Sequence, residues 1–93
     1  MRTIERSSAF KRDYKREMKG QHRKTLEKEL IKVLTALVHD QSLAEKYRDH
    51  TLSGEWMGYR ECHVKPDLLL VYKKSDDDIL KLARLGSHSE LDL

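Results

Sequence analysis

The sequence predicts an α+β fold: a short N-terminal strand, an antiparallel two-helix hairpin, and a three-stranded antiparallel meander, with the helices packed on one face of a twisted sheet. Apolar residues recur at helical spacing between residues 10 and 38, whereas short apolar runs bounded by turn-forming residues follow residue 56. The length points to one core, because 93 residues bury too little surface to stabilise two. Residues 1–93 are therefore expected to form a single domain.

The first elements are a strand and a helix. Thr3–Arg6 favours the strand, after which Ser7 or Ser8 can accept a hydrogen bond from a free helix N–H and start a helix. Apolar residues at every fourth position indicate one narrow buried stripe, and Gly20 offers a left-handed end. The stripe consists of Phe10, Tyr14 and Met18.

A second helix follows the short break at Gly20–Gln21. Its apolar positions recur every three or four residues, which is typical of a helix packed broadly on a core. Because the break is short, the two helices should lie antiparallel. The apolar positions are Leu26, Leu30, Val33, Leu34, Leu37 and Val38.

Strands replace helices in the C-terminal half. Residues 39–55 lose the helical period and should cross over to the sheet. Tight turns then predict an antiparallel meander, in which the apolar run from Leu68 to Tyr72 is central. The expected strands are Met57–Val64, Leu68–Lys74 and Ile79–Leu85, separated by turns at Lys65–Pro66 and Ser75–Asp77.

The first turn of the meander leaves two registers open. With a three-residue loop from Val64 to Pro66, His63 lies opposite Asp67 and the two can interact. With a two-residue loop, Asp67 faces Val64 instead. The choice matters because a slip of one residue sends side chains to opposite faces of the sheet.

Composition excludes several classes of protein. No apolar run approaches the roughly 20 residues of a membrane span, and the N-terminus lacks the pattern of a secretory signal. A cytoplasmic protein is expected. Cys62, the single cysteine, fits a small buried hydrophobe in a strand better than a reactive thiol. No glycine-rich loop opens a helix, so nucleoside triphosphates are not expected as ligands.

Positive charge is concentrated near the N-terminus. Residues 1–28 carry ten Lys and Arg against four acidic residues, a balance of +6, while the whole chain has +3. Such a field attracts phosphate backbones without reading sequence. The alternative is a solvated helix face with paired charges.

Titratable residues gather where strands should end. His50 lies in the crossover, His63 and Asp67 at the first turn of the meander, and His88 after the last strand. Cleavage of RNA at its own 2′-hydroxyl needs one group to take that proton and another to protonate the departing 5′-oxygen, and imidazoles with a carboxylate suffice. We therefore expect these four side chains to converge at one rim of the sheet.

Other residues could hold the RNA. Arg60 and Arg84 could bind the phosphate through bidentate hydrogen bonds. Trp56 and Tyr59 could stack on bases, although an aromatic side chain at the start of a strand is more often part of a core. His22 and His39, at or near helix ends, are interpreted as helix-end residues.

A metal is not expected. The histidines are not at helical spacing and no second carboxylate is expected near them, so neither a zinc site nor another cofactor is predicted.

Four strings spread over nearly the whole chain resemble the RelE/ParE superfamily of bacterial toxin-antitoxin systems, in particular its YafQ-like branch. The order of strand, two helices and meander is also that of the RelE-like fold. The strings are Tyr47-Arg-Asp-His50-x-Leu52-x-Gly54-x-Trp56, Gly58-Tyr-Arg60-x-x-His63-Val-x-Pro66-Asp67, Leu70-Val-Tyr72-Lys73 and Arg84-x-Gly86-x-His88.

The resemblance implies a ribosome-dependent endoribonuclease that cuts translated mRNA without a metal and is neutralised by a cognate antitoxin. It implies catalytic roles for His50, His63, Asp67 and His88. The assigned roles are His88 as general acid, His50 with Asp67 as the base side, and His63 with Arg60 as phosphate and orientation groups. The basic helices would contact ribosomal RNA through Lys11, Arg12, Lys15, Arg16, Lys19, Arg23 and Lys24.

The chain departs from the family pattern at two places. Leu68 and the tail Leu91-Asp92-Leu93 stand where relatives often have an aromatic residue, which puts base stacking in question. Two other functions remain as alternatives: a ParE-like toxin that inhibits DNA gyrase by binding, and a non-catalytic basic RNA-binding domain.

Overall fold

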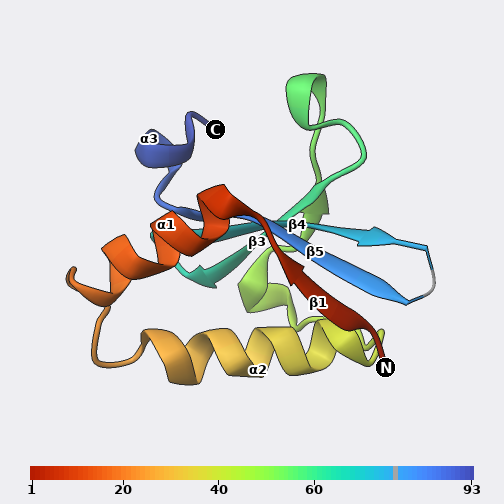
Figure 1. The fold of residues 1–93 in the computed structure, drawn as a ribbon, viewed down its shortest axis with the longest axis horizontal. Coiled ribbons are helices and arrows are strands. Elements are labelled where there is room, and N and C mark those ends of the chain that lie inside the picture. Colours follow the sequence, from red (N-terminus) through yellow and green to blue (C-terminus); the bar gives the residue numbers. More distant parts are fainter. Residues whose placement is uncertain (77) are drawn as a thin grey trace.

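The computed structural model describes residues 1–76 and 78–93 and has one mixed five-stranded sheet in the order β1-β5-β4-β3-β2 (Figure 1). Two short 3-10 turns, η1 and η2, lie in the connection between the helices and the meander. The elements are β1 Thr3–Arg6, α1 Ser8–Met18, α2 Leu26–Val38, η1 Glu45–Tyr47, β2 His50–Thr51, η2 Gly54–Trp56, β3 Arg60–Lys65, β4 Leu68–Ser75, β5 Ile79–Gly86 and α3 His88–Leu91.

The predicted meander is present as β3, β4 and β5, which pair antiparallel in sequence order. The N-terminal strand β1 pairs parallel with β5 at one edge. The prediction missed β2, a two-residue strand that pairs antiparallel with β3 at the other edge. The sheet therefore has one strand more than expected, and the added strand carries His50.

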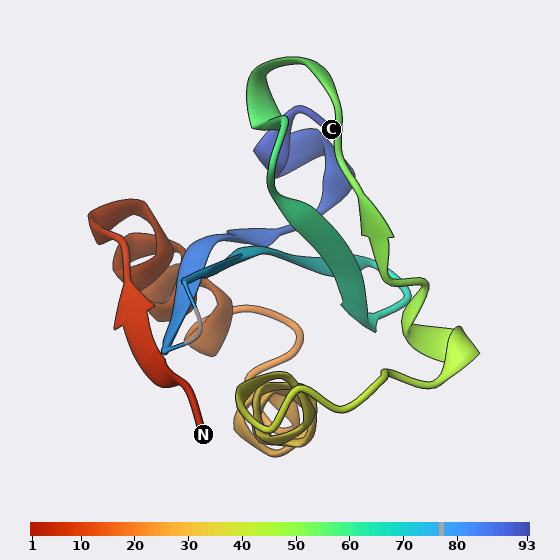
Figure 2. The same cartoon turned by 90° about the vertical axis from the view of Figure 1, so that its right-hand side faces the viewer.

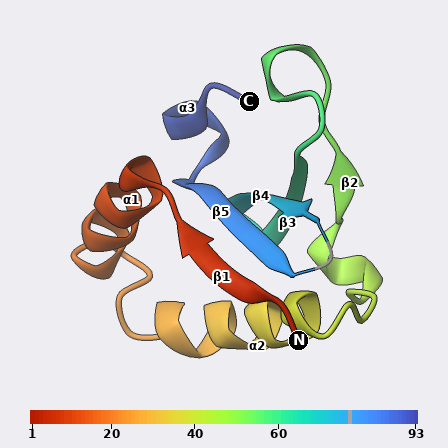
Figure 3. The same cartoon turned by 45° about the vertical axis from the view of Figure 1, so that its right-hand side comes forward.

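α1 begins directly after Ser7 and α2 spans the predicted apolar repeat, but the break between them covers residues 19–25 and is longer than the predicted Gly20–Gln21. Ser7 caps α1, because its side chain accepts a hydrogen bond from the N–H of Phe10 at 2.9 Å. In Figure 1 α1 and α2 run in opposite directions, and Figure 3 shows them joined at one end. The antiparallel hairpin is therefore confirmed.

The main core lies between the helices and one face of the sheet. Figure 2 shows α2 end-on beneath the sheet and α3 on the opposite side. Alternate residues of the strands point toward the helices, as the two-residue period requires. Cys62 is among them and is fully buried, and burial raises the pKa of its thiol, which confirms the interpretation as a small hydrophobe. The core contains Phe10, Leu26, Leu30, Val33, Leu37, Val38, Cys62, Val64, Leu68, Leu70, Tyr72, Leu80, Leu82 and Leu85.

A smaller apolar cluster covers the other face of the sheet. Leu69 and Val71 of β4 pack there with Leu91 of α3. Trp56 and Tyr59, which precede β3, pack against this cluster. We call this side the α3 face; it includes the residues of β3 that point away from α2.

Both registers considered for the first turn of the meander are wrong. Lys65 pairs with Leu68 and His63 with Leu69, and the register shifts between His63 and Lys65. The turn therefore consists of Pro66 and Asp67, and Asp67 has no partner across the strands.

The other boundaries differ slightly from the predictions. The strand expected from Met57 begins only at Arg60, because η2 and Gly58, with φ of 93°, turn the chain before it. β4 extends to Ser75; the predicted turn at Ser75–Asp77 includes Asp77, which lies outside the described residues. Among the residues described, no helix is both long and apolar enough to cross a membrane.

Candidate active site

The sheet and α3 bring three histidines and one glutamate to the α3 face. β2 places His50 directly opposite Glu61 of β3. Glu61 and His63 are two residues apart on one strand, so both point to the same side. His88 is the first residue of α3, which begins where β5 ends. The predicted convergence is therefore present for His50, His63 and His88.

His50 is held by acceptors on both ring nitrogens. Its Nε2 lies 3.0 Å from Oε2 of Glu61, and its Nδ1 lies 2.7 Å from the carbonyl oxygen of Arg48. A carboxylate and a carbonyl can only accept, so a doubly protonated imidazolium satisfies both contacts. The ring and the Glu61 carboxylate thus form one hydrogen-bonded acid–base pair.

His63 and His88 form a second pair. Their ring centroids are 5.6 Å apart and the ring planes meet at 63°. The Nδ1 of His63 lies 3.3 Å from the carbonyl oxygen of Pro66. Donation from Nδ1 leaves the lone pair of a neutral imidazole on Nε2. His63 is buried, whereas His88 is exposed and accessible to a substrate.

The end of β5 positions His88 through close packing. Ser87 caps α3 and forms a capping box with Glu90. A Cβ at Gly86 would lie 2.8 Å from Nη2 of Arg16 and 3.1 Å from Oε1 of Glu90, so these two side chains would have to shift. The glycine of the Arg84-x-Gly86-x-His88 string therefore permits α1 to pack against the start of α3.

Glu61 is a candidate functional residue that sequence reasoning missed. Its side chain is buried, and its Oε1 has no hydrogen-bond partner among the residues described. Burying a carboxylate oxygen without a partner is costly, which suggests a role beyond packing. The sequence contains a signal that could have identified Glu61. A residue two positions before His63 in a strand lies on the same face of the sheet as His63.

Glu61, His63 and His88 could also hold a metal ion. One ligand atom from each lies within 4.8 Å of the others. Two imidazoles and a carboxylate suit a divalent transition metal such as Zn²⁺. Glu61 is thus a second carboxylate beside these histidines, which the prediction of no metal did not include.

Asp67 was expected to lie beside His50 and His63, but its carboxylate contacts the loop between α1 and α2 instead. Its Oδ1 lies 3.1 Å from Nε2 of His22, and its Oδ2 accepts a hydrogen bond of 3.0 Å from Gln21. His50 and Asp67 lie at opposite ends of β3, so the carboxylate beside His50 is Glu61. His22, interpreted as a helix-end residue, lies in the loop directly before α2, and its ring also contacts Asp67.

Both arginines predicted to bind phosphate are paired with carboxylates. Arg60 donates two hydrogen bonds of 3.2 Å to Asp49, and the hydrogen bond with Asp49 raises the pKa of Arg60. Arg84 donates a hydrogen bond of 2.7 Å to the buried Asp13 of α1. A phosphate would have to compete with these carboxylates, so the structure assigns both arginines a structural role first.

Trp56 and Tyr59 lie on the α3 face as a packed pair. Their rings meet edge to face with centroids 5.2 Å apart, and both are half-buried against the α3-face cluster. Lys73 Nζ lies 5.5 Å from the centroid of Tyr59. Lys73 is thus a cation beside the aromatic pair, which the sequence reasoning did not select.

The two departures from the family pattern are only partly buried, because Leu68 and Leu91 are in apolar clusters whereas Asp92 and Leu93 are exposed. Leu68 is fully buried on the helix side of the sheet. Leu91, the last residue of α3, is buried in the smaller cluster. Any residue at position 68 would join the core in this fold.

The seven basic residues selected on the helical hairpin are all exposed. Arg16 differs from the rest because it also has structural contacts. Its guanidinium forms ion pairs with Asp13 and Glu17 of α1 and with Glu90 of α3, at 3.0 to 3.2 Å. Arg16 therefore joins α1 to the helix that carries His88.

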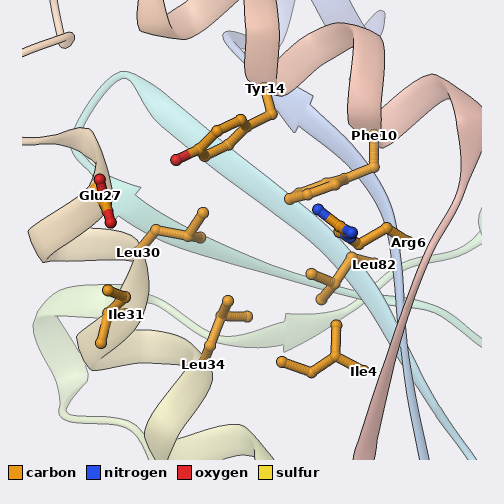
Figure 4. A pocket seen from close by; sticks show the side chains of 9 residues that line it. All are labelled: Ile4, Arg6, Phe10, Tyr14, Glu27, Leu30, Ile31, Leu34 and Leu82. Carbon is orange, nitrogen blue, oxygen red and sulfur yellow. The ribbon is translucent and has the colours of Figure 1, made fainter.

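A separate apolar hollow of about 440 Å³ lies between α1, α2 and β1 (Figure 4). Phe10, Tyr14 and Leu30 line it from the helices, and Ile4 lines it from β1. It lies on the helix side of the sheet, away from the histidines, and its lining contains no histidine. This hollow is suited to apolar contact rather than to acid–base chemistry.

Comparison with known proteins identifies the family. The family model described as "Bacterial toxin of type II toxin-antitoxin system, YafQ" matches residues 2–93. The mRNA interferase toxin YafQ of Escherichia coli B/BL21-DE3 is 38% identical over 91 residues, covering 97% of this chain and 95% of that protein. A putative toxin YafQ of Haemophilus influenzae is 43% identical over 63 residues; this shorter match covers 64% of this chain and 62% of that protein.

Solved structures agree with the sequence comparison. A crystal structure of a copper-bound mutant toxin from Helicobacter pylori superposes with a TM-score of 0.86 at 36% identity, covering 98% of this chain and 99% of that one. The crystal structure of the E. coli DinJ–YafQ complex has a TM-score of 0.79 at 34% identity, with 98% of both chains covered. The chain therefore belongs to the YafQ family of bacterial type II toxins, as the four sequence strings predicted.

Proposed function

We propose that this chain is a ribosome-dependent endoribonuclease toxin that cleaves translated mRNA in the cytoplasm and is neutralised by a cognate antitoxin. The observation that carries the proposal is the convergence of His50, Glu61, His63 and His88 on the α3 face. Its relatives in E. coli are mRNA interferase toxins by name. The cluster contains both proton donors and acceptors, so cleavage at the 2′-hydroxyl needs no metal.

The geometry supports a division of acid and base roles. The base side combines the exposed His50 with Glu61, whose Oε2 lies 3.0 Å from Nε2 of His50, and Glu61 takes the place first given to Asp67. His88, exposed at the start of α3, protonates the departing 5′-oxygen. His63 lies close to both Glu61 and His88 and orients the phosphate.

The surrounding surface suits a ribosome-bound message. Trp56 and Tyr59 offer aromatic surface for a base, and Lys73 places a positive charge beside them. The exposed basic residues of the helical hairpin contact ribosomal RNA, which gives binding without sequence readout.

An antitoxin requires a second surface. The relative YafQ from E. coli has been crystallised in complex with DinJ. The apolar hollow of Figure 4 is bordered by Ile4 and Ile31, which are 40% and 53% exposed. Exposed apolar side chains beside a hollow are typical of a protein contact, and we assign this surface to the cognate antitoxin.

Ribosome dependence predicts that the same message is cut when translated and left intact when free. The measurement is primer extension on one mRNA, with purified toxin, in the presence and absence of ribosomes and initiation factors. Equal cutting of free and translated mRNA would contradict ribosome dependence. Inhibition of gyrase supercoiling without mRNA cleavage would instead support the ParE-like alternative.

The same cluster predicts inhibition by zinc. Toxins from H. pylori have been crystallised with copper and with metal. If Zn²⁺ binds Glu61, His63 and His88, it occupies the groups that transfer protons, so added Zn²⁺ should lower the cleavage rate and raise the unfolding temperature. Glu61→Gln should weaken the rise in unfolding temperature, and His39→Ala should not. A zinc-selective chelator should leave the wild-type rate unchanged; a fall would show that catalysis needs metal.

A further inference from the structure

The loop between α1 and α2 carries a histidine that holds the β3–β4 turn. The side chain of His22 is only 13% exposed, although the loop residues on either side of it are exposed. Its Nε2 lies 3.1 Å from Oδ1 of Asp67, and Gln21 donates to Oδ2 at 3.0 Å. Two consecutive loop residues therefore engage both carboxylate oxygens of Asp67.

His22 is itself fixed to the core by the start of α2. Its carbonyl oxygen accepts a hydrogen bond of 2.8 Å from the N–H of Leu26, which is fully buried. Lys65, the last residue of β3, donates a hydrogen bond to Oγ1 of Thr25 in the same loop. The beginning of α2 and the end of β3 are thus joined at two neighbouring points.

The turn held by His22 also contacts His63. The carbonyl oxygen of Pro66 lies 3.3 Å from Nδ1 of His63. Neither Pro66 nor Asp67 has the positive φ found in the commonest two-residue hairpin turns. From outside the turn, Gln21 and His22 hold the Asp67 side chain.

We propose that His22 is a positioning residue for the cleavage reaction. It holds Asp67, and through the Pro66–Asp67 turn it sets the orientation and tautomer of His63. The inference rests on the proposed endoribonuclease function. Loss of a group that orients a functional histidine commonly costs about tenfold to a hundredfold in activity.

The kinetic test compares single-turnover cleavage on ribosomes programmed with one message. His22→Ala should lower the rate constant at saturating toxin by about tenfold, with less than a twofold change in the toxin concentration that gives half the maximal rate. His22→Gln should restore most of the rate, because its amide can donate from near the position of Nε2. His39→Ala is the matched control, since His39 is exposed and contacts the Thr35 carbonyl on α2.

A double variant separates positioning from a general loss of stability. If His22 acts through Asp67, His22→Ala combined with Asp67→Ala should be no slower than Asp67→Ala alone. Rate losses that multiply, or a His22→Ala protein that cuts at the wild-type rate, would overturn the inference. Thermal unfolding of each variant identifies any protein that is not folded at the assay temperature.

A measurement without cleavage distinguishes this inference from the proposed function. In ¹H–¹⁵N NMR spectra of the histidine rings, His22→Ala and Asp67→Asn should both move the His63 resonances, whereas His39→Ala should leave them in place. Unmoved His63 resonances would refute the positioning role even if the wild type cleaves. If the wild-type protein does not cleave mRNA but the His63 resonances move as expected, the proposed endoribonuclease function is refuted. The link from His22 through Asp67 to His63 would then still hold.

Discussion

His88→Ala is expected to lower the rate of cleavage of translated mRNA by about a hundredfold or more, because removal of a general acid typically costs two to four orders of magnitude. His88 is the exposed member of the pair whose ring centroids lie 5.6 Å apart, so its ring is accessible to the departing 5′-oxygen. The measurement is single-turnover cleavage of one message on purified ribosomes.

The variant should fold normally, since the side chain of His88 is exposed and α3 is capped by Ser87 and Glu90. His39→Ala again serves as the matched control for removal of an exposed histidine. If His88→Ala and His50→Ala both cut at the wild-type rate, the acid–base assignment made here is wrong. Binding to the ribosome should survive in both variants, because the basic helical hairpin is untouched.

Local patterns predicted the helices well. The repeat of apolar residues from Leu26 to Val38 gave both ends of α2, and Ser7 was one of two candidate caps for α1. These signals depend on neighbouring residues alone, so they can be read from the chain. The central strand β4 was predictable for the same reason, because Leu68 to Tyr72 is an unbroken apolar run between turns.

Short elements gave no such signal. β2 has two residues and α3 has four, which is too few for a period to be recognised. Their positions are fixed by tertiary pairing: His50 opposite Glu61, and Gly86 against Arg16. The sequence indicated His50 and His88 as candidates, but the elements that carry them appear only in the structure.

Partners distant in sequence were the least predictable part of the site. Gln21 and Asp67 are 46 residues apart, and Asp13 and Arg84 are 71 apart. The local sequence does not show whether Asp67 faces His63 or the loop between α1 and α2. The direction of the Asp67 side chain depends on a bulge at Val64, which shifts the register of β3 against β4. Glu61, in contrast, could have been predicted from the sequence. Side chains alternate between the two faces of a strand, so residues 61 and 63 of β3 lie on the same face.

Asp13→Ala is expected to lower the free energy of unfolding by about 2 to 4 kcal/mol, since it leaves a buried N–H without an acceptor and breaks a largely buried ion pair. The Asp13 side chain is 5% exposed and accepts hydrogen bonds from Arg84 at 2.7 Å and from the N–H of Leu85 at 3.0 Å. Asp13→Asn should cost less, because its amide oxygen can still accept from Leu85. Urea unfolding at neutral pH measures both.

The same carboxylate should make stability depend on pH. Burial raises the pKa of Asp13, but hydrogen bonds from Arg84 and Leu85 and the charges of Arg84 and Arg16 outweigh it, so the pKa lies below its usual 3.8. A pKa lowered on folding stabilises the protein above the unfolded value, and this stabilisation is lost as the pH falls through the folded value. The gap in unfolding free energy between wild type and Asp13→Asn should therefore be constant above about pH 5 and narrow below pH 4. Asp92→Asn, at an exposed position after α3, is the control.

Asp13 also connects stability to the candidate active site. It anchors Arg84 and Leu85, and the next three residues lead to His88 at the start of α3. Arg16, which pairs with Asp13, donates to the Leu85 carbonyl and pairs with Glu90. Loss of Asp13 should thus loosen α3 before the whole domain unfolds, and the cleavage rate of Asp13→Asn should fall at temperatures where its far-ultraviolet circular dichroism is still native. If the cleavage rate of Asp13→Asn falls only at temperatures where the whole domain unfolds, the local link between α1 and His88 is contradicted.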